Sequence, residues 1–161
     1  MTENDIKSRL FALRDEKYRD FQTKLVPTVK PERMIGVRLP ALRTLAKELS
    51  REPSTALYLA RLPHEFYDED MLHALILNEE KDFGLLMEKL RAFLPCVDNW
   101  AVCDTIKPKL FKKRRAELLP AIPEMLASPH EYTVRFGLGM LMANYLDDDF
   151  SKEVLELAAS V

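Results

Sequence analysis

Apolar residues recur at intervals of three and four along almost the whole chain, which is the spacing of one face of an α-helix. Leu39, Leu42, Leu45, Ala46 and Leu49 show this pattern, with charged residues between them. Few segments alternate apolar and polar residues as a half-buried strand does. We therefore expect an all-α protein, with helices near residues 3–15, 17–25, 39–50, 54–61, 65–78, 82–92, 99–110, 113–127, 131–146 and 150–160.

The expected helices are short and their joints are short. This arrangement is typical of antiparallel helix pairs that stack into an α-solenoid, as in HEAT-like and ARM-like repeats. The sequence has no clean repeat of fixed period, so a compact helical bundle is the alternative. With 161 residues, the chain is about one domain, and we expect a single domain over residues 1–161. Pro108, Pro120 and Pro123 fall late in or inside expected helices and would split or kink them.

Charge is distributed in alternating blocks, although the net charge of the chain is only −2. Residues 17–51 and 89–115 each carry net +6, whereas residues 52–88 carry −7 and residues 116–161 carry −6. If each block keeps one orientation in the fold, the basic blocks form a localised electropositive surface. The alternative is a set of ordinary solvated faces of uneven composition.

Several functional classes lack a signal in the sequence. The longest uncharged run, residues 136–146, is too short to cross a membrane. The first ten residues do not have the charge pattern of a signal peptide, and two cysteines make no disulfide framework. No phosphate-binding loop, metal-ligand spacing or serine-nucleophile motif occurs. We expect a cytoplasmic protein with reduced thiols, no metal site and no cofactor.

Two segments contain candidate functional residues. Trp100 and Asp104 are four residues apart, so a helix places them on one face, one turn apart. A core tryptophan beside a surface aspartate is the simpler interpretation. Arg135 is the only charge between Tyr132 and Leu146 in a segment that is apolar nearly all round. This arginine either forms a buried ion pair or points at an anion in a groove, since guanidinium suits phosphate.

Four segments in matching order resemble the DNA alkylation repair family of HEAT-like-repeat DNA glycosylases, the AlkD-like proteins. They are FQTKLVP at residues 21–27, GVRLPALR at 36–43, FLPCVDNWAVCD at 93–104 and EYTVRF at 131–136. The NWAVCD and YTVRF parts are the most specific, and the resemblance extends over the whole chain. Members of this family continue for several more helices, so we expect this chain to lack the family's last helices.

The resemblance also implies roles for individual residues. The family's catalytic aspartate falls on Asp104, its active-site tryptophan on Trp100 and its DNA-contacting arginine on Arg135. Arg38 and Arg43 fall where the family places residues near the DNA backbone. A second set of expected backbone contacts is a basic run that a solvated turn between helices would also explain: Lys107, Lys109, Lys112, Lys113, Arg114 and Arg115.

The implied activity is release of cationic purines, alkylated at N3 or N7, from double-stranded DNA. Hydrolysis of their N-glycosidic bond passes through an oxocarbenium-like sugar, which a carboxylate such as Asp104 stabilises. No Schiff-base lysine is needed, so the enzyme would be monofunctional, and we expect a monomer. The alternative is a non-enzymatic HEAT-like scaffold that binds DNA structures or a protein. Clustering of Trp100, Asp104 and Arg135 favours the enzyme, whereas Arg135 sealed in the core with Glu131 or Asp147 favours the scaffold.

Overall fold

The computed structural model of the protein describes residues 3–147 and 150–161. Within these ranges the only β contact is an isolated antiparallel bridge between Arg14 and Val37. The α-helices are α1 (Glu3–Ala12), α2 (Glu16–Leu25), α3 (Leu39–Leu49), α4 (Thr55–Leu59), α5 (Tyr67–Leu77), α6 (Phe83–Phe93), α7 (Trp100–Thr105), α8 (Arg115–Leu118), α9 (Ile122–Leu126), α10 (Glu131–Tyr145) and α11 (Lys152–Ala159). Short 3₁₀ helices are η1 (Pro31–Arg33), η2 (Leu94–Cys96), η3 (Lys109–Lys113) and η4 (Leu119–Ala121).

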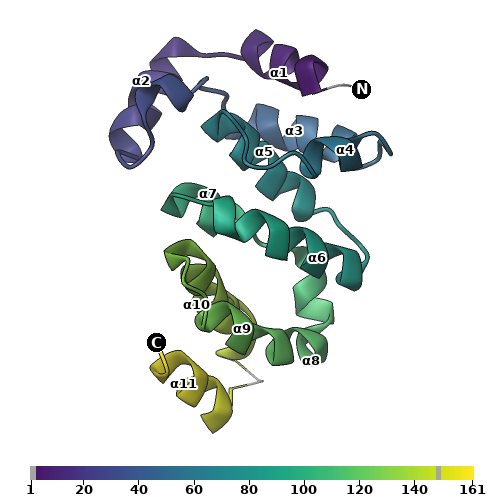
Figure 1. The fold of residues 1–161 in the computed structure, drawn as a ribbon, viewed down its shortest axis with the longest axis vertical. Coiled ribbons are helices and arrows are strands. Elements are labelled where there is room, and N and C mark those ends of the chain that lie inside the picture. The colour runs from purple at the N-terminus through teal and green to yellow at the C-terminus, as the bar shows by residue number, and fades with distance from the viewer. Residues whose placement is uncertain (1–2, 148–149) are drawn as a thin grey trace.

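The helices stack in chain order from the N-terminus to the C-terminus (Figure 1). One row runs through the stack, because α3 packs on α5, α5 packs on α7 and α7 packs on α10. A hydrophobic core follows the stack from Ile6 to Val154. The expected all-α solenoid of stacked helices is therefore confirmed, and the row of α3, α5, α7 and α10 provides the scaffold for the candidate site.

The expected helices over 99–110 and 113–127 differ most from the observed ones. The helix expected over 99–110 ends at Thr105. The backbone is extended at Ile106, two residues before Pro108. The helix expected over 113–127 is divided into α8, η4 and α9. Pro120 and Pro123 lie in the first turns of η4 and α9, where a missing N–H leaves no hydrogen bond unmade.

Candidate functional site

Helix α7 carries two of the predicted site residues and begins at a side-chain cap. The Asn99 side chain accepts a hydrogen bond from the Val102 N–H at 2.9 Å, which satisfies one of the free amides of the first turn. Trp100 is the first residue of α7 and is 37% exposed. Asp104 lies one helical turn further along. The simpler interpretation of Trp100 as a core tryptophan does not hold, because more than a third of this residue faces solvent.

Asp104 and Arg135 form a two-bond ion pair between α7 and α10. Arg135 donates from Nε to Asp104 Oδ1 at 2.8 Å and from Nη2 to Oδ2 at 2.7 Å. Their side chains are 41% and 50% exposed, and hydrogen bonding to Asp104 raises the pKa of Arg135. Arg135 is therefore not sealed in the core with Glu131 or Asp147, which was the arrangement that favours the scaffold alternative.

Asp104 lies in a groove of about 630 Å³ that crosses α3, α5 and α7. The groove is lined by four basic side chains, namely Arg43, Lys47, Lys107 and Lys109, and also by Asn78 and Glu79. We call this the basic groove. Within it, Lys109 is 3.5 Å from Glu79. Basic side chains from two segments at least 60 residues apart thus outnumber the two carboxylates of the groove, Asp104 and Glu79, an arrangement that attracts a polyanion.

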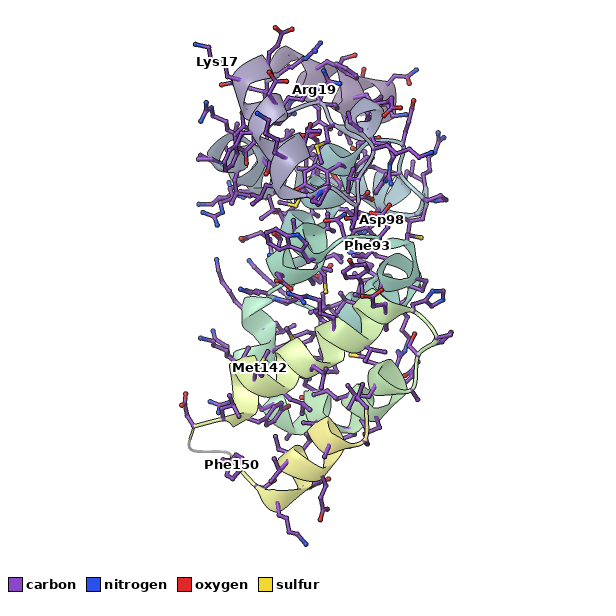
Figure 2. All side chains as sticks on the ribbon, turned by 90° about the vertical axis from the view of Figure 1, so that its left-hand side faces the viewer. Lys17, Arg19, Phe93, Asp98, Met142 and Phe150 are labelled. Carbon is purple, nitrogen blue, oxygen red and sulfur yellow. The ribbon has the colours of Figure 1, made fainter. Side chains whose placement is uncertain are left out.

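A second hollow adjoins the ion pair on its α10 side. It measures about 410 Å³, and apolar residues such as Ile106 and Met142 line it together with Asp104 and Arg135. Met142 is 62% exposed and projects from α10 (Figure 2). The segment that is apolar nearly all round in sequence therefore leaves part of its apolar surface exposed on α10. The helix packs mainly on α9 and α7, and the part of its surface that carries Met142 is open beside the site.

Arg38 lies at the end of a loop that a buried carboxylate holds. Asp68 of α5 accepts hydrogen bonds from the Ile35 and Val37 N–H groups, both at 2.7 Å. Gly36 between them has φ +92°, and a Cβ there would lie 2.5 Å from Arg19 Cβ. Arg38 itself is exposed and bonds Asp15 at 2.8 Å. It is not among the residues that line the basic groove.

The basic run from Lys107 to Arg115 divides into two parts. Lys107 and Lys109 line the basic groove. Lys112 and Lys113 are exposed, at the end of η3. Arg114 pairs with Glu117 and lies over the Phe83 ring at 5.5 Å from its centroid, and Arg115 donates to the carbonyls of Lys112 and Asn144.

Sequence reasoning missed some residues that the fold brings to the site. Lys47 and Asn78 line the basic groove, and their positions beside Asp104 depend on the packing of α3, α5 and α7. The helical spacing of Arg43 and Lys47, four residues apart on one face, was the only available signal. Neither Lys47 nor Asn78 belongs to a motif.

Two histidines nine residues apart also meet, but in the core. His64 Nε2 lies 2.9 Å from His73 Nδ1, and His73 stacks on Phe93 with ring centroids 3.9 Å apart. Burial lowers the pKa of His73 well below its ordinary value. Among the described residues, no group of three or more His, Cys, Asp or Glu is arranged to hold a metal ion. The pair is part of the packed interior.

The chain was compared with protein families, with curated proteins and with solved structures. The model of the family described as DNA alkylation repair enzyme matches residues 6–161. The chain belongs to this family. No curated protein and no solved structure gave a significant match.

Membership of the DNA alkylation repair enzyme family supports a role in DNA repair and DNA as the substrate. The basic groove is consistent with a DNA ligand, because four cationic side chains line it around Asp104. No helix in the described ranges is long and apolar enough to cross a membrane.

Proposed function

We propose that this protein is a monofunctional DNA glycosylase that hydrolyses the N-glycosidic bond of cationic N3- or N7-alkylated purines in double-stranded DNA. The observation that carries the proposal is the Asp104–Arg135 pair, which is exposed rather than buried in the core. Asp104 lines the basic groove, and Arg135 lines the hollow that adjoins it. In the proposed complex, a carboxylate in that position lies next to the sugar of the bound strand, and the surrounding cations bind its phosphates.

The proposed reaction needs no acid from the protein to protonate the leaving group. Alkylation at N3 or N7 places a positive charge on the purine, so the base leaves as a neutral molecule without protonation by an acid. Positive charge then develops on the deoxyribose, as in other glycosidic cleavages. In our proposal the ionised Asp104 stabilises that charge and orients the attacking water. Trp100 packs its exposed ring against the sugar and the cationic nucleotide.

Arg135 has the geometry to serve both Asp104 and a phosphate. Two of its five N–H groups donate to Asp104. The remaining donors have no hydrogen-bond partner among the described residues, so a phosphate next to the lesion can accept them. In the proposed complex, Arg135 fixes Asp104 and the backbone at the same time. Arg43, Lys47, Lys107 and Lys109 extend the contact along the strand.

The test is the product analysis of duplex DNA treated with a methylating agent. The proposal predicts that the protein releases free methylated purines and leaves abasic sites in uncut strands, because no lysine forms a Schiff base. Chromatography with mass detection identifies the free base, and a gel without alkaline treatment reports strand cleavage. Binding of the same DNA without release of any base would favour the non-enzymatic scaffold. Strand cleavage without alkali would contradict the monofunctional mechanism.

A further inference from the structure

One arginine outside the basic groove bridges two carboxylates on different elements. Arg33 of η1 donates from Nη2 to Asp70 Oδ2 at 3.0 Å and from Nη1 to the carboxylate of Asp98. The Asp70 side chain, on α5, is only 4% exposed, whereas that of Asp98 is 44% exposed. Asp98 lies near the middle of the stack (Figure 2), two residues before α7 begins. Arg33 therefore ties the entry to α7 to the interior of α5.

The second oxygen of Asp98 continues the link into α7. Asn99 donates from Nδ2 to Asp98 Oδ1 at 2.9 Å, and its own Oδ1 accepts the Val102 N–H that starts the helix. Asn99 is 1% exposed, so its amide has no water to replace either partner. A continuous path of hydrogen bonds thus runs from Asp70 through Arg33, Asp98 and Asn99 to the first turn of α7.

The other end of α7 is held by α5 as well. The Asn78 side chain, directly after α5, donates to the Thr105 carbonyl at 2.8 Å and accepts from the Lys107 N–H at 2.7 Å. Helix α7 has only six residues, and a helix this short has little stability of its own. Its orientation therefore depends on its packing between α5 and α10 and on the groups that hold its two ends.

We propose that Asp98 is a positioning residue that sets the orientation of α7, and with it the positions of Asp104 in the basic groove and of Trp100 at the start of the helix. The inference deepens the proposed function and rests on it for its effect on base release. Because Asn78 keeps the far end of α7 in place, loss of the Asp98 link tilts the helix about Thr105. Trp100, at the free end, moves further than Asp104. Small displacements of reacting groups have large effects on rate, whereas phosphate contacts elsewhere in the groove are unchanged.

Asp98→Asn is the variant that tests this role. An amide offers one acceptor oxygen where the carboxylate offers two, so either Arg33 or Asn99 loses its partner. Glu124→Gln is the matched control, because Glu124 is another exposed carboxylate, at 61%, that Arg91 holds with hydrogen bonds to both oxygens. The urea midpoint of each variant reports whether the fold is intact.

Two readouts separate positioning from a structural role. Trp100 is the only tryptophan of the chain, so iodide quenching of its fluorescence reports the start of α7 directly. The second readout is the single-turnover rate of base release at saturating protein, beside the dissociation constant for the same DNA. We expect Asp98→Asn to change the quenching, to slow base release about 10-fold and to leave DNA binding within about twofold. Glu124→Gln is expected to match the wild type in all three.

The outcomes distinguish failure of this inference from failure of the proposed function. Wild-type quenching and a wild-type rate in Asp98→Asn would overturn the positioning role. A wild-type protein that releases no base would overturn the proposed function only. In that case the quenching comparison alone decides, and a change in Asp98→Asn that Glu124→Gln lacks supports Asp98 as the residue that orients α7.

Discussion

Two aspartate–arginine pairs, Arg33–Asp70 and Arg135–Asp104, have opposite surroundings. In the first, Asp70 is 4% and Arg33 30% exposed, and Arg33 also bonds Asp98. In the second, Asp104 is 41% and Arg135 50% exposed. Burial raises the pKa of Asp70 to about 8, even though Arg33 acts in the other direction. The same two chemical groups thus form a largely buried structural pair in Arg33–Asp70 and a solvent-accessible pair in Arg135–Asp104.

The largest expected effect comes from breaking the buried pair. Arg33→Ala leaves the carboxyl of Asp70 buried without its donor, and we expect a loss of about 2–4 kcal/mol in the free energy of unfolding. The loss should be greater at pH 9 than at pH 6, because an ionised carboxylate suffers more from burial. Arg135→Ala should change stability by less than about 1 kcal/mol. Urea unfolding of both variants checks the contrast, and equal losses would contradict it.

Binding of DNA should show the opposite order. Arg135→Ala removes a guanidinium with donors free for a phosphate, so we expect about 10-fold weaker binding of duplex DNA. The slope of log Kd against log salt concentration should fall by about 1, the value that corresponds to the loss of one phosphate contact. Fluorescence anisotropy at several salt concentrations measures both quantities. An unchanged affinity and slope would remove Arg135 from the proposed interface.

The raised pKa of Asp70 makes the free energy of unfolding depend on pH. The folded protein keeps a proton that the unfolded chain releases near pH 4. This group therefore adds stability at low pH, and its contribution is lost as the pH rises toward about 8. Relative to Asp70→Asn, the wild type should lose stability between pH 5 and 8, by at most about 1.4 kcal/mol per pH unit. Urea titrations at pH 5, 6.5 and 8 test the slope, and a difference that rises with pH would contradict the direction.

The smallest expected effect compares the two faces of α10. A Cβ on Gly139 meets nothing within 4 Å, whereas one on Gly137 lies 3.0 Å from Leu126 Cδ2 and 3.1 Å from Met125 Cβ. Gly139→Ala should therefore stabilise the protein by about 0.5–1 kcal/mol. Gly137→Ala should not stabilise the protein, because Leu126 and Met125 of α9 must shift to make room for the added methyl group. Thermal unfolding of the two variants side by side checks this difference, and an equal change in both would mean that the two faces are packed alike.

Helix periodicity made most of the fold predictable. Sequence positions alone could not show how the site assembles, because Asp104 and Arg135 meet only through the packing of α7 on α10. The acids at the start of α5 were the least predictable part. They belong to the most acidic block of the chain, yet Asp68, Glu69 and Asp70 are buried. Their observed partners include the amides of residues 35–37 and Arg33, which lie more than 30 residues earlier.

The role of Asp104 is tested most directly by a comparison of the wild type with Asp104→Asn on the same methylated duplex DNA. Base release is followed at saturating protein, and DNA binding is measured in parallel. If the exposed carboxylate stabilises the developing sugar cation, its amide variant should bind DNA within about threefold and release purines at least 100-fold more slowly. Release at the wild-type rate by Asp104→Asn would contradict the central claim that this carboxylate performs the chemistry.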